Sequence, residues 1–196
     1  MTTGSLTASE LASRTRARLA ERDRRVVSPG PLVPAAVLIP IVDRGEAYLV
    51  FAKRTEHVGH HRGQIGFPGG IVDPDDASYL DAALRECEEE IGLPRRAVEP
   101  LGALDDTETV ATSFVITPFV GLVTEPVAWQ PDGHEIEKVI EVPFSALARD
   151  GSFRVESWES HGVRRPVYFF DYGEDTIWGA TARILKHYLD VIAPTS

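Results

Sequence analysis

Apolar residues occur along the chain in two repeating patterns, one with the spacing of strands and the other with the spacing of helices. Nearly continuous apolar runs at residues 34–42 and 47–53 predict two buried strands, and the polar residues 43–46 predict a tight turn between them. Further strands are expected at residues 65–67, 98–104, 114–123, 135–142, 154–158 and 165–172. Many strands together with two long helices predict an α/β fold in which a mixed β-sheet is sandwiched between α-helices.

Two long stretches have the three- and four-residue apolar spacing of an amphipathic helix. The central one has Leu80, Ala83, Leu84, Cys87 and Ile91 on one face and ends at Gly92. The last one spans residues 177–192 with Asp175 or Thr176 as its N-cap, and a short helix is expected from Pro143 to Leu147. The apolar face of the last helix consists of Ile177, Ala180, Ile184, Leu185, Tyr188 and Ile192.

The first 30 residues are polar and rich in Arg, Ala, Ser and Glu. Thr7 or Ser9 could cap a short helix there, and the Ser-Pro-Gly-Pro sequence at residues 28–31 predicts its end. Because the apolar face of this helix is weak and its basic residues are mixed with acidic ones, we expect residues 1–30 to be an N-terminal helical arm. Such an arm would pack on the domain or on a second copy, rather than bind RNA or a membrane. Residues 31–196 then form one domain, which is long enough to bury a substantial core.

The central helix carries four glutamates near its C-terminal end. At about 100° per residue, Glu86, Glu89 and Glu90 share one flank, whereas Glu88 points elsewhere. Carboxylates so close together repel one another, and negative charge is unfavourable at a helix C-terminus. A solvated acidic face is the ordinary interpretation of such a run. A bound divalent cation would neutralise it, and carboxylate oxygens suit Mg2+ or Mn2+.

The chain of 196 residues has a formal net charge of −10. This charge argues against sequence-independent binding of nucleic acid, but it allows a phosphorylated ligand because a bound cation can reverse the local sign. Cys87 is the single cysteine, so no intrachain disulfide can form. No apolar run approaches the roughly 20 residues of a membrane span, and the N-terminus lacks the apolar core of a signal peptide. We therefore expect a cytoplasmic protein without a membrane partner.

Three histidines, His57, His60 and His61, lie close together in a polar stretch with several glycines. Clustered histidines can bind zinc, but no cysteine accompanies these and no helix spaces them. We expect the three side chains to be structural or to face a substrate.

Glycines and charged pairs around the central helix follow the order of a known motif. The elements of the motif are Gly69-Gly70, Arg85-Glu86, Glu89-Glu90 and Gly92. At these spacings they resemble the Nudix box of Nudix hydrolases. The loop of the box is one residue longer here than in the general pattern, so the early glutamate of the box corresponds to Asp76 or Ala77.

The resemblance implies a Nudix pyrophosphohydrolase, which uses a metal ion to displace a group at phosphorus. It assigns the metal ion, Mg2+ or Mn2+, to Glu86, Glu89, Glu90 and the carbonyl oxygen of Gly69. The general base could be Glu86 or a loop residue such as Glu135. Arg85 could orient a neighbouring carboxylate by paired hydrogen bonds, although a surface ion pair fits the spacing equally well.

A second motif precedes the box. Arg54, residues 61–65 and residues 67–70 resemble the motif of the coenzyme A-directed branch of Nudix hydrolases. Val58-Gly59 stands where that motif usually has a leucine and a basic residue. The likeness continues at residues 104–106, 115–118, 141–143 and 177–182. The residues that would bind the substrate are Arg54, His61, Arg62, Gln64, Gly69 and Gly70.

This likeness implies hydrolysis of coenzyme A or acyl-coenzyme A to 3′,5′-ADP and 4′-phosphopantetheine or its acyl form. The main partner would then be a small-molecule nucleotide, and a homodimer is a further expectation. Two alternatives stay open. One is a Nudix hydrolase of another nucleoside diphosphate derivative, such as ADP-ribose, NADH or a dinucleoside polyphosphate. The other is a Nudix-fold module that binds a nucleotide without turnover, which would not need the complete set of charged pairs.

Overall fold

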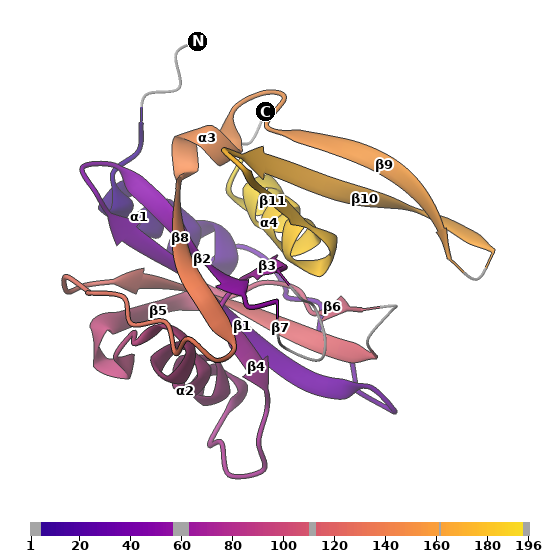
Figure 1. The fold of residues 1–196 in the computed structure, drawn as a ribbon, viewed down its shortest axis with the longest axis horizontal. Helices are drawn as coiled ribbons and strands as arrows, with labels where there is room; N and C mark the ends of the chain where they lie inside the picture. The colour runs from indigo at the N-terminus through magenta and orange to yellow at the C-terminus, as the bar shows by residue number, and fades with distance from the viewer. Residues whose placement is uncertain (1–4, 57–62, 110–112, 161, 194–196) are drawn as a thin grey trace.

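The computed structural model describes residues 5–56, 63–109, 113–160 and 162–193. Its centre is a mixed sheet of eight strands. The strands are β1 (Val33–Asp43), β2 (Ala47–Arg54), β3 (Ile65–Gly66), β4 (Gly69–Ile71), β5 (Val98–Ala103), β6 (Thr107–Glu108), β7 (Phe114–Val123) and β8 (Ile136–Pro143). The main order is β3-β2-β1-β7-β5, while β4, β6 and β8 pair with β1, β7 and β2 (Figure 1). β1 and β7 run parallel, and the other described pairs are antiparallel.

A second, smaller sheet has three antiparallel strands in the order β11-β10-β9. Its strands are β9 (Phe153–Ser160), β10 (Val163–Tyr172) and β11 (Asp175–Trp178). The ribbon of β9 and β10 extends away from the rest of the molecule (Figure 1). The helices are α1 (Ala8–Ala20), α2 (Tyr79–Ile91), α3 (Phe144–Ala148) and α4 (Gly179–Ile192), and a 3-10 turn spans Arg95–Ala97.

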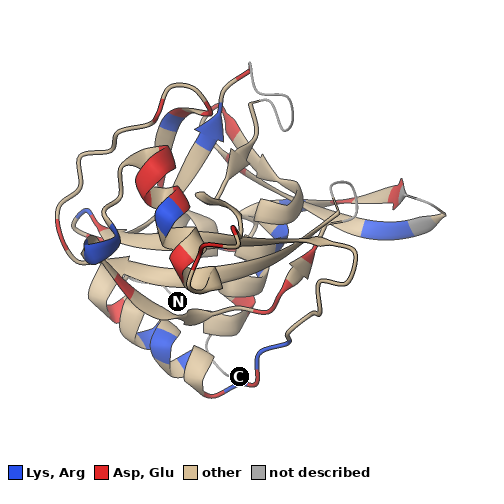
Figure 2. Ribbon diagram, turned by 90° about the horizontal axis from the view of Figure 1, so that it is seen from below, with Lys and Arg blue, Asp and Glu red and all other residues tan. Residues whose placement is uncertain are grey.

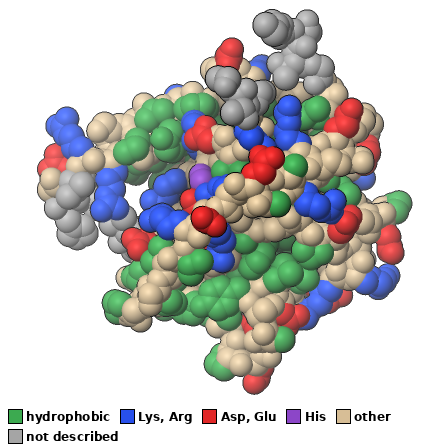
Figure 3. Space-filling view, turned by 180° about the vertical axis from the view of Figure 1, so that it is seen from behind, with side chains coloured by type: hydrophobic (Ala, Val, Ile, Leu, Met, Phe, Trp, Pro, Cys, Tyr) green, Lys and Arg blue, Asp and Glu red, His purple; other side chains and the backbone are tan. Residues whose placement is uncertain are grey.

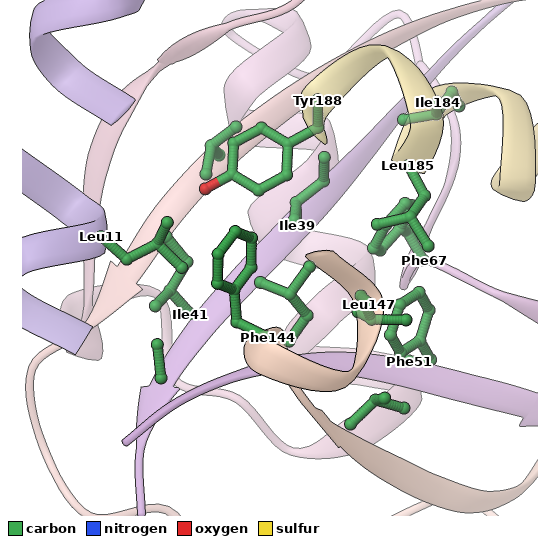
Figure 4. Close-up of a cluster of buried hydrophobic side chains, with 14 of the residues drawn as sticks. Leu11, Ile39, Ile41, Phe51, Phe67, Phe144, Leu147, Ile184, Leu185 and Tyr188 are labelled. Carbon is green, nitrogen blue, oxygen red and sulfur yellow. The ribbon is translucent and has the colours of Figure 1, made fainter. Parts of the chain in front are cut away.

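Helices cover both faces of the main sheet, with α2 on one side and α1 and α4 on the other (Figure 1). On the α2 side, Cys87 and Ile91 lie in one buried cluster with Leu38 of β1. On the other side, the buried hydroxyl groups of Thr15 and Tyr188 are 2.7 Å apart and join α1 to α4. The predicted α/β sandwich is therefore confirmed. The buried cluster on the side of α1 and α4 is drawn in Figure 4. The side chains labelled there are Leu11, Ile39, Ile41, Phe51, Phe67, Phe144, Leu147, Ile184, Leu185 and Tyr188.

α1 begins where the sequence predicted but ends earlier. The Thr7 hydroxyl accepts the N–H of Glu10 at 3.2 Å, and the Glu10 carboxylate accepts the N–H of Thr7 at 2.9 Å, which closes a capping box. The helix ends at Ala20, so the end expected at residues 28–31 is wrong. The segment after the helix is held instead by ion pairs with the chain that follows β5. The pairs are Arg22 with Asp105 and Arg24 with Asp106.

The N-terminal helix contributes to the main core. Leu11 and Ala12 are buried in the same cluster as strand residues of β1 and β2. The division into an arm at residues 1–30 and a domain at residues 31–196 stays a prediction.

α4 starts later than its apolar spacing indicated. Ile177 belongs to β11, which pairs with β10, and neither Asp175 nor Thr176 caps the helix. Trp178 occupies the N-cap position without a side-chain hydrogen bond. Ala180 is only partly buried, whereas the buried residues of α4 are Ala182, Ile184, Leu185, Tyr188 and Ile192. Because a strand leads directly into the helix, apolar spacing alone could not locate the boundary.

The region expected as a loop at residues 105–112 contains the short strand β6. Charged residues of both signs are distributed over helices, strands and loops (Figure 2). Across the described part of the chain, no helix combines the length and the apolar character needed to cross a membrane.

Candidate active site

α2 is held at both ends by residues that the sequence places there. The Ser78 hydroxyl accepts the N–H of Asp81 at 3.1 Å, which caps the start of the helix. Gly92 ends the helix with a φ of 69°, and a β-carbon there would lie 2.8 Å from the Cβ of Gln130. The buried residues of α2 are Ala82, Ala83, Cys87, Glu90 and Ile91, and the residues of the expected stripe that are only partly buried are Leu80 and Leu84.

Glu90 is a buried carboxylate, with 9% of its side chain exposed. Its Oε2 accepts the backbone N–H of Gly69 at 3.0 Å, and its Oε1 lies 3.8 Å from Nη1 of Arg54. Burial raises the pKa of Glu90 to about 7, and the nearby Glu86 adds to the rise, while the Gly69 N–H opposes it. The protein therefore holds a carboxylate that is costly to ionise without a further positive charge.

Glu86 lies against the backbone of β4. A β-carbon on Gly70 would come within 2.5 Å of the Glu86 carboxyl carbon, so only glycine allows this approach. Gly69 has a φ of +146°, and a β-carbon there would lie 2.3 Å from the carbonyl oxygen of Ala36. Burial raises the pKa of Glu86 even though Arg85 lowers it. The two glycines thus bring the strand, the Glu86 carboxylate and β1 close together.

Arg85 connects the loop before α2 to the acidic cluster. Its Nε and Nη2 donate to the two carboxylate oxygens of Asp76 at 2.9 and 3.0 Å, and Nη2 also donates to the Ile71 carbonyl at 3.2 Å. Nη1 donates to Glu86 at 2.8 Å and to Glu89 at 3.2 Å. Only 23% of the Arg85 side chain is exposed, so the orienting role fits better than a surface ion pair.

Asp76, in the lengthened loop of the box, pairs with Arg85. Its side chain is 4% exposed, and the Arg85 guanidinium holds the pKa of Asp76 below its usual range. Of the two residues that could correspond to the early glutamate of the box, Asp76 is the one that carries a carboxylate to Arg85. The sequence did not indicate this role.

Glu88 and Glu89 are less enclosed than Glu86 and Glu90. The Glu89 side chain is 60% exposed and contacts Arg85, whereas Glu88 lies 3.6 Å from Nε of Arg95. The acidic cluster therefore consists of Glu86 and Glu90, with Glu89 at its exposed rim and Glu88 directed elsewhere.

Arg54, at the end of β2, joins the acidic cluster to a second carboxylate. Its Nη2 donates to Oε2 of Glu135 at 2.9 Å, while Nη1 faces Glu90. The Glu135 side chain is 49% exposed, and its charge contributes to the raised pKa of Glu86 and of Glu90. The structure thus brings the predicted Arg54 and Glu135 to the same site as the glutamates of α2.

Asp132 positions Glu135, a role that the sequence analysis missed. Its carboxylate accepts the N–H groups of His134, Glu135 and Ile136 at 3.1, 3.0 and 2.8 Å. Its own N–H donates to the carbonyl of Glu90 at 3.1 Å. The Asp-Gly pair at this turn was a usable signal, because aspartate side chains often bind backbone N–H groups just ahead of them.

Comparison with known proteins agrees with this geometry. A family model described as the NUDIX domain matches residues 31–168. The chain belongs to the Nudix family. An "Uncharacterized Nudix hydrolase NudL" from Yersinia enterocolitica is 39% identical over 152 residues, which are 78% of this chain and 77% of the relative. A protein of the same name from Salmonella paratyphi B is 38% identical over 78% of this chain and 79% of its own.

A solved structure supports the Nudix fold. The crystal structure of a MutT/nudix family protein from Enterococcus faecalis matches with a TM-score of 0.52 at 18% identity, over 88% of this chain and 66% of that chain. The predicted enzyme class, a Nudix pyrophosphohydrolase, is supported by the family and by relatives named as Nudix hydrolases.

Of the residues predicted to bind the substrate of this Nudix protein, the structure describes Arg54, Gln64, Gly69 and Gly70. The Gln64 carbonyl accepts the N–H of Arg54 at 2.9 Å, which ties the start of β3 to the end of β2. His61 and Arg62 lie outside the described residues, as do His57 and His60.

Nudix hydrolases generally depend on a divalent metal ion, so the fit of the acidic cluster to such an ion matters. With the side chains as they lie in the described residues, no group of three or more His, Cys, Asp and Glu is arranged to hold a metal. Arg85 contacts both Glu86 and Glu89 in this arrangement. The donor chemistry nevertheless fits a hard cation, because Glu86 and Glu90 supply crowded, partly desolvated carboxylate oxygens.

Proposed function

We propose that this Nudix protein hydrolyses the pyrophosphate of coenzyme A or acyl-coenzyme A to 3′,5′-ADP and 4′-phosphopantetheine or its acyl form. The observation that carries the proposal is the position of Arg54. This residue opens the coenzyme A-type motif, and its guanidinium faces both Glu90 and Glu135. Arg54 therefore links the motif that suggests the substrate to the carboxylates that suggest the chemistry.

We further propose that Mg2+ or Mn2+ is held by Glu86, Glu89, Glu90 and the carbonyl oxygen of Gly69. When bound, such an ion offsets charge on the phosphate oxygens and lowers the pKa of the attacking water. The raised pKa values of Glu86 and Glu90 support this assignment, because burial disfavours both ionised carboxylates and a bound cation would favour them.

The chain's own groups then have distinct roles. Asp76 fixes Arg85, and Arg85 in turn fixes the Glu86 carboxylate. The Gly69 N–H fixes Glu90. Two carboxylates are candidates for the general base: Glu86, whose pKa burial moves toward neutrality, and Glu135, which faces solvent beside Arg54.

The substrate contacts of the proposal follow the motif. Arg54 would bind a phosphate oxygen as well as it binds Glu135, because a guanidinium pairs with both anions in the same way. The remaining proposed contacts are His61, Arg62, Gln64, Gly69 and Gly70. The choice between Mg2+ and Mn2+, a homodimer and a cytoplasmic location stay predictions.

A turnover screen tests the substrate. The purified protein is assayed with Mg2+ and with Mn2+ on coenzyme A, acyl-coenzyme A, ADP-ribose, NADH and diadenosine polyphosphates. We expect the highest kcat/KM for coenzyme A or an acyl derivative. A clear preference for ADP-ribose or a dinucleotide would favour the other nucleoside diphosphate hydrolases, and binding without turnover of any compound would favour a non-catalytic nucleotide-binding module.

A further inference from the structure

A cavity outside the acidic cluster gathers cationic side chains from distant parts of the chain. Its volume is about 270 Å³, several times the roughly 30 Å³ that one water molecule occupies in the liquid. The cavity lies between the segment before β1, the chain around β6, the strand β10 and the helix α4. Its lining residues are Arg25, Asp105, Asp106, Thr107, Glu108, Arg165, Arg183 and His187.

This arginine cavity is separate from the acidic cluster. Thr107 of β6 pairs with Ile116 of β7, Ile116 pairs with Ala35 of β1, and Ala35 pairs with Ile71 of β4. Three strand spacings of about 4.8 Å each therefore separate β6 from β4. The cavity is lined by α4, whereas the acidic cluster belongs to α2 on the opposite face of the sheet.

Two carboxylates at the cavity are already neutralised. Asp105 pairs with Arg22, and Asp106 pairs with Arg24. Glu108 is exposed, and its side chain forms no ion pair within the described ranges. It is therefore the one lining carboxylate left to face the arginines of the cavity.

The three lining arginines have no carboxylate partner within the part of the chain that the structure describes. Among the described residues, neither Arg25, Arg165 nor Arg183 forms an ion pair; Arg25 and Arg183 donate to the backbone carbonyls of Asp106 and Glu108. Burial lowers the pKa of Arg183, and the nearby charges of Arg165 and Arg25 lower it further, against an opposing effect of Glu108. Guanidinium groups are thus crowded here with too little negative charge. Basic side chains gather beside a histidine on one face of the molecule (Figure 3).

His187 adds a polar atom without a partner. Its Nε2 is buried and makes no hydrogen bond in the described structure, although Oδ2 of Asp105 lies 3.4 Å away. Burial lowers the pKa of His187 below its ordinary value, so the ring is mainly neutral at pH 7 and can donate or accept one hydrogen bond from this nitrogen.

We propose that the arginine cavity binds a phosphate group. A phosphate dianion offers enough charge and enough acceptor oxygens for several guanidinium groups, and arginine binds it through paired, parallel hydrogen bonds. The group could come from free inorganic phosphate or from the phosphomonoester of a nucleotide. The chemistry is the same for both sources, and neither depends on the activity proposed for the acidic cluster.

Calorimetric titration of the full chain with inorganic phosphate, at low salt and with a chelator present, tests the proposal. Without a divalent cation the carboxylates of the acidic cluster disfavour phosphate there, and the arginine variants assign any remaining binding to the cavity. We expect saturable binding that Arg183→Gln and Arg165→Gln each weaken about tenfold or more, the scale of a lost charge-assisted hydrogen bond. Arg96→Gln is the matched control, since Arg96 is exposed and does not line the cavity, and it should leave binding unchanged.

The proposal is wrong if the wild-type chain shows no saturable phosphate binding, or if Arg96→Gln weakens phosphate binding as much as the cavity variants do. Arg165 is exposed, so Arg165→Gln settles the question even if Arg183→Gln fails to fold. A parallel titration with 3′,5′-ADP and 5′-AMP identifies the source: tighter binding of a nucleotide with the same arginine dependence indicates a nucleotide phosphomonoester, and binding of inorganic phosphate alone indicates the free ion.

Discussion

The acidic cluster and the arginine cavity lie on opposite faces of the same sheet and have opposite charge. At the first, burial and like charge raise the pKa of Glu86 and Glu90. At the second, burial and like charge lower the pKa of Arg183. In both places the fold makes the charged form of these side chains less favourable than it is in water. Because burial is the main cause of these shifts and like charge adds to it, a bound cation would stabilise the acidic cluster and a bound anion would stabilise the arginine cavity.

The two sites also differ in how they are built. The acidic cluster is local, since its glutamates lie on one helix and its glycines on the neighbouring strand. The arginine cavity draws Arg25, Arg165 and Arg183 from three distant parts of the chain. A single substitution in the acidic cluster should therefore lower activity strongly. Each arginine substitution in the cavity should remove only part of the phosphate affinity.

The largest expected effect is on catalysis at the acidic cluster. Glu86→Gln or Glu90→Gln should lower kcat about a hundredfold or more, because each removes charge that matters most in the transition state. KM should change less. Steady-state kinetics on the best substrate of the turnover screen measure both.

Glu88→Gln is the control for these two variants. Glu88 forms an exposed pair with Arg95, so its substitution should be nearly silent. Equal losses of kcat at Glu88 and Glu90 would show that the cluster is only a solvated acidic face, and the contrast with the arginine cavity would disappear.

A second effect is a dependence of stability on pH that arises at the acidic cluster. With a chelator present, the pKa of Glu90 is about 7 in the folded protein and lies near its ordinary value of 4.5 in the unfolded chain. The folded state then binds more protons between these values, so Glu90 contributes stability below about pH 4.5 that is lost as the pH rises through 7. We expect the free energy of unfolding of the metal-free protein to fall by on the order of 2 kcal/mol across this pH range.

Urea unfolding at pH 5 and pH 8 measures this loss. Glu90→Gln should reduce the dependence of the unfolding free energy on pH, because the glutamine cannot ionise. Arg165→Gln should leave this dependence unchanged. If the wild-type protein becomes more stable from pH 5 to pH 8 and Glu90→Gln behaves identically, the pKa of Glu90 is not raised in the folded protein.

The smallest of the three effects arises at Gly70. The three atoms nearest to a β-carbon there belong to the far end of the Glu86 side chain, which can move aside. Gly70→Ala should therefore lower kcat about tenfold by displacing the carboxylate, with less than about 1 kcal/mol lost from the free energy of unfolding.

Gly69→Ala is the contrasting variant. Its β-carbon would meet the backbone of Ala36, so it should destabilise the fold more than Gly70→Ala does. The prediction for Gly70 fails if Gly70→Ala keeps full activity, or if it unfolds as readily as Gly69→Ala.

Local patterns predicted much of this molecule. The strands around residues 34–53, the helix ending at Gly92 and the flank shared by Glu86 and Glu90 depend on spacing within one element. The boundary before Gly179 was missed because β11 and α4 join without a polar break, and the end of α1 was missed because Arg22 and Arg24 are held by contacts distant in sequence. The same reason hid the arginine cavity, which exists only after distant segments meet. Asp132 was missed although its contacts with the N–H groups of residues 134–136 are local.

If the acidic cluster is a cation site, the protein should bind Mn2+ there in the absence of substrate. Calorimetric titration at pH 7.5, without substrate, should give a Kd for Mn2+ that Glu90→Gln weakens about tenfold or more and that Glu88→Gln leaves unchanged. If Mn2+ binds Glu90→Gln as tightly as it binds Glu88→Gln, Glu90 does not hold the cation and the account of this site is wrong.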